Sequence, residues 1–213
     1  MYAIPTKQEM TAALLSRCPA HLQEKFQNST IAVCGLGGLG SNIAVSLARA
    51  GIGKLILIDF DQVDISNLHR QQYKASQIGM YKTDALAANL LEISPYLNLV
   101  LHTTQIQKEN VSSLLSDADI ICEAFDRAEI KAMLVNGVLE ELPDAYLIAA
   151  SGMAGLGSAN EIKTRKISDR FYLCGDEKSD VADTPGLLSS RVMLCAAHQA
   201  HMALRILAGK SDG

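Results

Sequence analysis

The pattern of apolar and polar positions predicts alternating strands and helices. Short apolar runs are typical of strands that are covered on both faces of a sheet. Such runs lie at 31–34, 54–58, 97–102, 118–122 and 145–151. Positions with helical periodicity lie at 39–50, 81–93, 111–115, 129–142 and 190–208. This alternation predicts an α/β fold with a Rossmann-like, doubly wound, mostly parallel sheet and flanking helices.

The N-terminal stretch has a different pattern. Residues 1–29 are mostly polar and predict a short helical arm with helices at 8–15 and 19–26. This arm is expected to pack on the main domain or on a second subunit. Residues 30–213 then form the main domain.

The C-terminal part is less regular before its last helix. A further strand is expected at 161–167. Residues 168–188 are polar with mixed charge and predict a mobile crossover loop. Ser189 or Ser190 is expected to cap the helix that follows, because a hydroxyl accepts a hydrogen bond from free helical N–H groups.

Composition limits the class of protein. The chain has 213 residues, of which 48% are hydrophobic and 5% aromatic, so we expect an aliphatic core. The net charge of −4 gives no sign of affinity for nucleic acid or membranes. No apolar run has the length of a membrane span, and no signal pattern follows the first residue. We therefore expect a cytoplasmic protein.

The five cysteines predict reduced thiols. None forms a C-x-x-C pair, so no zinc site is expected. Cys34, Cys122 and Cys195 lie in apolar runs and are expected to be buried as small hydrophobic residues. Cys174 differs, because it lies in the polar stretch before the last helix.

A glycine-rich segment connects the first predicted strand to the first long helix. Gly35, Gly37 and Gly40 fit the pattern G-x-G-x-x-G. The first glycine permits a tight turn, the second lets a phosphate approach the backbone, and the third lets helix and strand pack closely. The free N–H groups of the helix would then face an anion. The pattern predicts nucleotide-phosphate binding, with a plain structural turn as the alternative.

Further polar groups follow the carboxyl ends of the predicted strands. They are Asp59, Asp61, the segment 67–71, Lys82 and Asp126. Two cations and two carboxylates around a phosphate loop suit a nucleoside triphosphate with Mg²⁺. In the alternative interpretation, Arg70 and Lys82 are solvated surface residues and Asp126 caps a helix ahead of Arg127.

Taken together, these motifs resemble a known family. The motifs are Gly35–Gly40, Leu57–Asp61, Ser66–Gln71, Gly79 with Lys82, and Asp126. In this order they resemble the ThiF/MoeB branch of the ubiquitin-activating superfamily over residues 30–155. Within the branch the chain is most similar to the compact ThiF subfamily.

The resemblance implies an adenylyltransferase that uses ATP and Mg²⁺. Its substrate would be the C-terminal glycine of a small ubiquitin-like sulfur carrier, ThiS, with a Gly-Gly tail. It implies that Asp61 holds the ribose, and that Asp126 positions Mg²⁺. Asn67, Arg70 and Lys82 would contact the phosphates, with Arg70, Lys82 and Asp126 as catalytic residues. The remaining nucleotide-binding residues would be Gly35, Gly37, Gly38, Gly40, Asp59 and Gln71.

Some features depart from the family pattern. The zinc-binding C-x-x-C pairs are missing, and Arg127 follows Asp126 where many relatives carry asparagine. Relatives pair as homodimers, and an N-terminal segment with an arginine reaches across the dimer. Arg17 is a possible substitute for that arginine here. In relatives a loop cysteine can link to the carrier, and Cys174 is the candidate here. Its acidic flanks would raise rather than lower its pKa.

Three other functions remain open at this point. An ATP-dependent dehydratase acting on a tRNA base shares the same motifs, but it should present a basic face. A NAD-binding oxidoreductase would explain the glycines and an acid, but it would leave residues 67–71 without a role. A non-catalytic scaffold is disfavoured by the retention of Arg70, Lys82 and Asp126.

Overall fold

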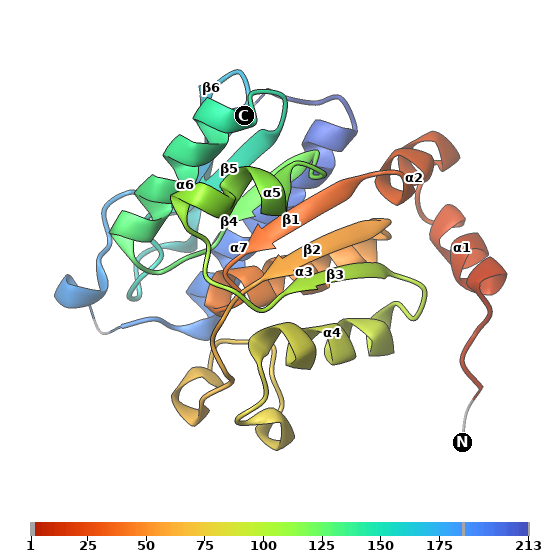
Figure 1. Cartoon of the computed structure of the whole chain (residues 1–213), viewed down its shortest axis with the longest axis horizontal. Coiled ribbons are helices and arrows are strands. Elements are labelled where there is room, and N and C mark those ends of the chain that lie inside the picture. The colour runs from red at the N-terminus through yellow and green to blue at the C-terminus, as the bar shows by residue number, and fades with distance from the viewer. Residues whose placement is uncertain (1–2, 185, 213) are drawn as a thin grey trace.

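A single mixed sheet runs through the molecule in this computed structural model, which describes residues 3–184 and 186–212. The strand order is β3-β2-β1-β4-β5-β7-β6. The strands are β1 (Thr30–Cys34), β2 (Lys54–Ile58), β3 (Asn98–His102), β4 (Ile120–Glu123), β5 (Tyr146–Ala150), β6 (Lys163–Ser168) and β7 (Phe171–Gly175). All neighbouring strands pair in parallel except β6 and β7. The predicted fold class is confirmed (Figure 1).

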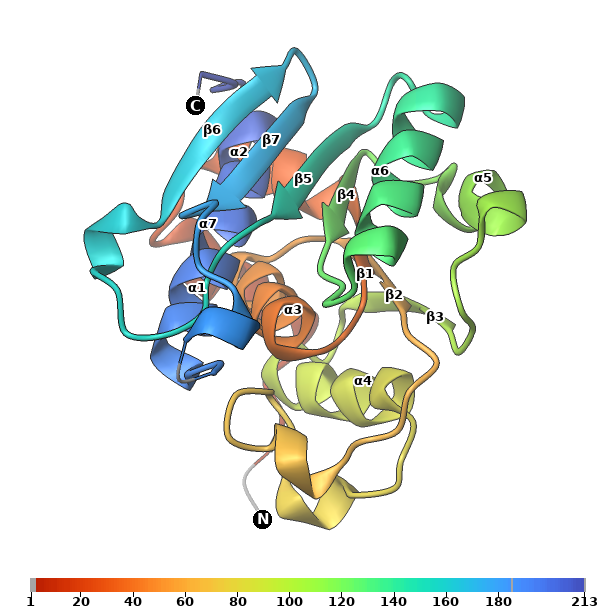
Figure 2. The same ribbon diagram turned by 90° about the vertical axis from the view of Figure 1, so that its left-hand side faces the viewer.

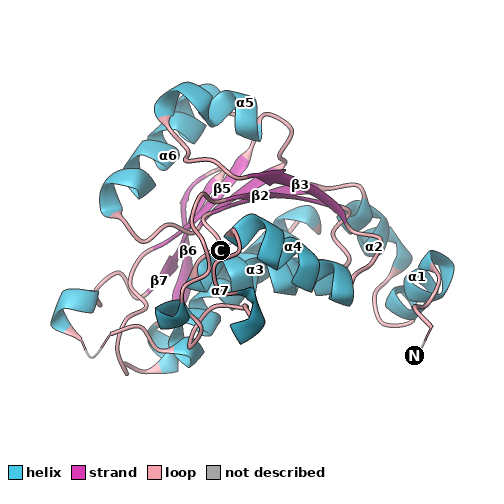
Figure 3. Cartoon of the chain, turned by 60° about the horizontal axis from the view of Figure 1, so that its bottom comes forward, coloured by secondary structure: helices cyan, strands magenta, loops and turns pink. Residues whose placement is uncertain are grey.

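Helices cover both faces of this sheet. They are α1 (Lys7–Leu15), α2 (Ala20–Gln27), α3 (Gly38–Ala50), α4 (Lys82–Ile93), α5 (Val111–Leu115), α6 (Ala128–Glu141) and α7 (Ser189–Leu207). In Figure 3, α5 and α6 lie on one face, and α3, α4 and α7 lie on the other. Among the described residues, no helix is long and apolar enough to cross a membrane.

The buried strands divide their side chains between two cores. In β1, Ile31 and Val33 join the core under α3 and α7, whereas Ala32 and Cys34 join the core under α5 and α6. The same alternation holds along β2. Successive strand side chains point to opposite faces, so a strand covered on both faces must be apolar throughout. This is the physical reason for the continuous apolar runs in the sequence.

The N-terminal arm is held to the body through α2. Phe26 is buried, and Gln23 Nε2 donates to the carbonyl oxygen of Gly51 over 3.3 Å. By contrast, α1 buries none of its residues, although Thr6 and Glu9 close its N-terminus with reciprocal hydrogen bonds. A helix with no buried face gains little from packing, so α1 depends mainly on its own caps.

The structure corrects two predictions near the C-terminus. The segment expected to be an irregular loop contains β7, which pairs with β5 and β6 (Figure 2). Neither Ser189 nor Ser190 caps the last helix. Its N-cap is Leu188, without a side-chain hydrogen bond. The helix itself, and the strands at the predicted positions, are confirmed to within about two residues at each end.

The glycine-rich turn after β1 brings the backbone into close contact with itself. Gly35 has φ +89°, a backbone conformation that residues with a side chain rarely adopt. A Cβ atom on Gly40 would lie 1.8 Å from the carbonyl oxygen of Gly35. Gly37 is different, because the nearest atom to an added Cβ is Gln71 Nε2 at 3.7 Å. The predicted roles of the first and third glycines as turn and packing residues are thus visible in the structure.

We therefore expect Gly40→Ala to lower the free energy of unfolding by about 2 kcal/mol or more, because the added methyl group forces helix and strand apart. Gly37→Ala is the matched control and should change it by less than about 1 kcal/mol. Urea denaturation followed by circular dichroism measures both. Equal stability of the two variants would show that the close packing at Gly40 is not required.

Candidate nucleotide-binding site

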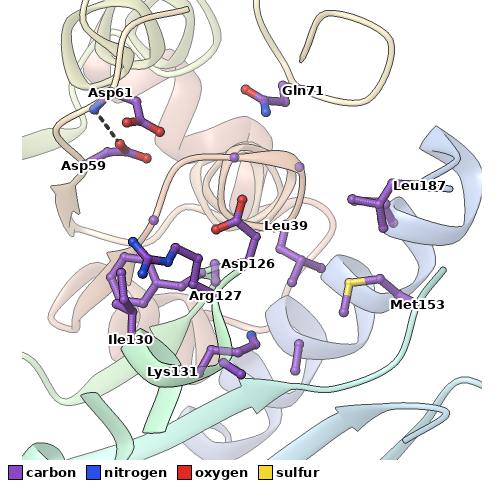
Figure 4. Close-up of a pocket in the computed structure, with 18 of the residues that line it drawn as sticks. Leu39, Asp59, Asp61, Gln71, Asp126, Arg127, Ile130, Lys131, Met153 and Leu187 are labelled. Carbon is purple, nitrogen blue, oxygen red and sulfur yellow. Dashed lines mark hydrogen bonds between the residues drawn. The ribbon is translucent and has the colours of Figure 1, made fainter. Parts of the chain in front are cut away.

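A cavity of about 750 Å³ opens at the carboxyl ends of β1, β2, β4 and β5. The chain reverses its direction of winding between β1 and β4, and open α/β sheets bind ligands at this switch point. The glycine turn, both aspartates after β2, and the start of α6 line the cavity (Figure 4). Nearly all the polar residues singled out in the sequence meet here. They are Asp59, Asp61, Asn67, Arg70, Gln71, Lys82 and Asp126.

The start of α3 supplies free backbone donors to this cavity. Its N-cap is Gly37, which has no side chain to accept from the first N–H groups of the helix. Gly37 and Gly38 both line the cavity. A Cβ on Gly38 would lie only 3.0 Å from Val192 Cγ1, so this turn has no room for a larger residue. These features fit a phosphate group at the positive end of a helix.

Asp59 joins the glycine turn to the end of β2. Its carboxylate accepts from the Leu36 N–H at 2.6 Å and from the Asp61 N–H at 2.8 Å. Burial raises the pKa of Asp59, while Lys82 and these two N–H groups oppose that rise. Asp59 thereby ties the glycine turn to the end of β2.

Asp61 and Lys82 form an ion pair at the rim of the cavity. Lys82 Nζ lies 2.8 Å from Asp61 Oδ2 and 4.0 Å from Asp59 Oδ2. Lys82 is nearly buried, whereas Asp61 is half exposed. The interpretation of Lys82 as a solvated surface residue is therefore wrong. Carboxylates hold the Lys82 ammonium in place. To contact a phosphate, the ammonium must leave these carboxylates or contact the phosphate in addition to them.

The segment around Arg70 is fixed by the first turn of α3. Asn42 Nδ2 donates to the carbonyl oxygen of Arg70 over 3.2 Å, and the Gln72 N–H donates to Ser41 Oγ over 3.1 Å. Gln71 is buried, and its Oε1 has no hydrogen-bond partner among the described residues. An unpaired buried amide oxygen in a cavity is an acceptor that a ligand hydroxyl or amine can satisfy.

Arg70 and Asp126 are the uncommitted charges of the site. Among the described residues, the Arg70 guanidinium makes only a long 3.4 Å contact to the carbonyl oxygen of Ser66 and a 3.3 Å contact to His69. In the part of the chain that the structure describes, neither Arg70 nor Asp126 takes part in an ion pair. The N-cap of α6 is Arg127, so the interpretation of Asp126 as a helix cap is wrong.

A buried ion pair that the sequence did not reveal lies at the end of β4. Glu123 is fully buried at the end of β4, and both its oxygens accept from Lys131 Nζ, at 2.9 and 2.8 Å. The N–H groups of Phe125 and Ala150 also donate to it. Burial raises the pKa of Glu123, and Lys131 opposes that rise. Lys131 also lines the cavity.

The placement of Cys174 in a polar loop is wrong. Cys174 lies in β7 with no exposed surface. Its thiol contacts the hydroxyl of Thr164, and its carbonyl oxygen accepts from the thiol of Cys195. Burial raises the pKa of the Cys174 thiol to about 11. A covalent link between Cys174 and a carrier protein stays a prediction, and it would require β7 to open. Cys34, Cys122 and Cys195 are buried as predicted.

Residues 179–181 and Leu187, which lie between β7 and α7, also line the cavity. Arg191 is buried and pairs with Asp176, and it also donates to the carbonyl oxygen of Ser158 at 2.9 Å. Burial tends to raise the pKa of Asp176, but the N–H groups of Ser179 and Lys178 together with Arg191 hold it well below its usual range. Met153 and Val181, which lie in neighbouring segments, line the cavity.

A model of the ThiF family matches residues 10–213, so the chain belongs to the ThiF family. The adenylyltransferase and sulfurtransferase UBA4 of Scheffersomyces stipitis is 35% identical over 136 residues, which are 63% of this chain and 30% of that protein. The probable molybdopterin-synthase adenylyltransferase of Porphyra purpurea is 36% identical over 119 residues, 55% of this chain and 31% of that protein. In both cases the match spans under a third of the relative's length.

Solved structures share the fold. Escherichia coli tRNA N6-threonylcarbamoyladenosine dehydratase, TcdA, in complex with ATP matches with a TM-score of 0.86 at 20% identity, over 98% of each chain. Escherichia coli MccB with succinimide matches with a TM-score of 0.71 at 20% identity, over 91% of this chain and 59% of that chain. These likenesses show that the fold is shared.

We expect Asp59→Asn to lower the free energy of unfolding by about 1–3 kcal/mol. In the variant, an amide nitrogen replaces one of the two carboxylate oxygens. This nitrogen is a donor and faces the N–H of Leu36 or of Asp61, so that N–H loses its acceptor. The control is Asp64→Asn, an exposed carboxylate that accepts from the Ser66 N–H. It should change stability by no more than about 0.5 kcal/mol. Urea denaturation that gives equal values for both would contradict this role of Asp59.

Proposed function

We propose that this protein adenylylates the C-terminal glycine of a small ubiquitin-like sulfur carrier of the ThiS type, for synthesis of the thiazole part of thiamine. ATP is the second substrate, and pyrophosphate is released. The observation that carries the proposal is that one cavity collects the glycine turn, Arg70, Lys82 and Asp126. Family membership and the adenylyltransferase relatives support the class of reaction.

The nucleotide would lie across the ends of β2 and β1. Asp61 would bind the ribose hydroxyls, and the free N–H groups of α3 would face the phosphates. Arg70, Lys82 and Asn67 would bind the triphosphate oxygens, while Gln71 Oε1 would accept from the ligand. The turn at Gly37 and Gly38 gives the phosphates their close approach to the backbone.

The reaction is one displacement at phosphorus. The glycine carboxylate is ionised at neutral pH, so no protein base is needed. One of its oxygens forms a bond to the α-phosphorus of ATP. The bond from that phosphorus to the bridging oxygen breaks, and pyrophosphate leaves with the electron pair. The protein contributes alignment and stabilisation of the charge that develops on the phosphates.

We assign Mg²⁺ to Asp126, an uncommitted carboxylate at the cavity. Oxygen ligands of this kind suit Mg²⁺, which neutralises phosphate charge when bound. We also expect a twofold homodimer, in which the unpacked α1 of the arm meets the second copy. Light scattering that gives a monomer mass independent of concentration would contradict the dimer.

Choice of nucleotide gives the first test. We expect Mg-ATP to raise the melting temperature more than NAD does at the same concentration. The reason is that the positive charges of Arg70 and Lys82 suit the negative charge of a triphosphate. A bound ligand stabilises the folded protein, and the effect grows with the logarithm of the ligand concentration divided by its dissociation constant. Equal or greater stabilisation by NAD would favour the oxidoreductase alternative instead.

The second test removes the charges one at a time. Arg70→Ala, Lys82→Ala and Asp126→Ala should each lower carrier-dependent ATP–pyrophosphate exchange about a hundredfold or more, because each acts on charge that develops in the transition state. Lys82→Ala should also lose stability, since Lys82 is buried with its carboxylates. Asp61→Ala should raise the KM for ATP first. Arg49→Ala, an exposed cation on α3, is the control and should keep wild-type exchange.

The result that would overturn the proposal is near wild-type exchange by folded Arg70→Ala and Asp126→Ala proteins. A measurement of ATP consumption separates the tRNA dehydratase alternative. If the protein acts on tRNA, then tRNA and not a Gly-Gly carrier will stimulate consumption of ATP.

A further inference from the structure

The pair of Glu123 and Lys131 is buried at the carboxylate and open to the cavity at the lysine. Lys131 comes from α6, and its side chain is 23% exposed, while that of Glu123 is 1% exposed. Among the described residues, the only hydrogen-bond acceptors of Lys131 Nζ are the two oxygens of Glu123. An ammonium has three N–H donors, so one is left over. The exposed side of Lys131 faces the cavity.

Glu123 itself has no capacity left for a ligand. Its oxygens accept from Lys131, from the Phe125 N–H at 2.7 Å and from the Ala150 N–H at 3.4 Å. Buried charges are tolerated when they are paired and hydrogen-bonded in this way. Glu123 therefore fixes the position of the Lys131 ammonium, and Lys131 is the member of the pair that can meet a substrate.

The order of groups across the sheet indicates which substrate this is. Asp61 follows β2, the glycine turn follows β1, and Asp126 follows β4. The bond from the Ala150 N–H places the Glu123 carboxylate at the border of β4 and β5. Neighbouring strands are about 4.8 Å apart, so the pair lies beyond the glycine turn on the side away from Asp61.

The close-up agrees with this order. In Figure 4, Asp59 and Asp61 lie at one side of the cavity, Lys131 lies at the opposite side, and Asp126 lies between them. A nucleotide with its ribose at Asp61 and its phosphates at the glycine turn leaves the Lys131 end for the second substrate. That substrate brings a carboxylate, for which a fixed ammonium is a suitable partner.

We propose that Lys131 binds the carboxylate of the acyl substrate and orients one of its oxygens toward the α-phosphorus, with Glu123 as the positioning residue. This inference rests on the proposed function. Lys131 contacts the carboxylate oxygen that does not attack, which becomes the carbonyl oxygen of the acyl adenylate. The attacking oxygen stays free to form the new bond to phosphorus, with pyrophosphate as the leaving group.

The test compares two adenosine probes, of which only the second carries an acyl group. AMP reports the nucleotide side, and 5′-O-[N-(glycylglycyl)sulfamoyl]adenosine, a stable mimic of the acyl adenylate, reports both sides. The variant is the double substitution Glu123→Gln with Lys131→Gln, which removes both charges and leaves no unpaired buried one. The control is Lys54→Gln with Asp117→Asn, an ion pair of 3.2 Å near the other end of β2.

Calorimetry should show that the wild-type protein binds the acyl mimic more tightly than AMP. The double variant at Glu123 and Lys131 should keep its affinity for AMP within about threefold and lose about tenfold or more in affinity for the mimic, as expected for a charged hydrogen bond. The control pair should change neither affinity. A wild-type protein without preference for the mimic contradicts the proposed function, whereas an unchanged preference in the folded double variant contradicts the role of Lys131.

Lysine footprinting of the wild-type protein tests the same contact without a substitution. Acetylation followed by mass spectrometry should show that the acyl mimic protects Lys131 and that AMP does not. If AMP and the mimic protect Lys131 equally, or if neither protects it, Lys131 does not bind the acyl substrate.

Discussion

The structure depends on a close approach of the backbone to itself at the turn after β1. Because Gly40 has no side chain, the first turn of α3 can lie directly against the carbonyl oxygen of Gly35. This contact aims the uncapped start of α3 at the ends of β1 and β4. Ser41 and Asn42, in the same turn, then hold the segment that carries Arg70 and Gln71. One steric constraint thus fixes both the phosphate-binding backbone and the side chains around it.

The charges of the site are arranged in two groups. Lys82 and Lys131 are held by carboxylates, with Lys82 on Asp61 and Lys131 on Glu123, and these pairs lie on opposite sides of the glycine turn. Arg70 and Asp126 have no ion-pair partner in the described part of the chain. The paired cations are preorganised at fixed positions, which lowers the cost of arranging charge during a reaction. The uncommitted charges are the ones that can respond to phosphates and a metal ion.

Sequence reasoning was sufficient where local pattern determines structure. The apolar runs predicted the strands of the central sheet, and the spacing of Gly35, Gly37 and Gly40 predicted the turn. It failed where tertiary contacts decide. The strand β7 is short and lies among charged residues, so only its pairing with β5 and β6 identifies it. The role of Lys131 was missed because a lysine on a helix is usually solvated, and its buried partner Glu123 belongs to another element.

The central claim is that the cavity joins AMP to the carboxylate of a carrier protein. Intact-mass spectrometry measures this directly on an acid-quenched mixture of the protein, Mg-ATP and a ThiS-type carrier that ends in Gly-Gly. The account predicts that the carrier gains the mass of one adenylyl group at its C-terminal glycine, and that a carrier without that glycine gains none. A carrier that stays unmodified while the protein binds Mg-ATP would contradict the account.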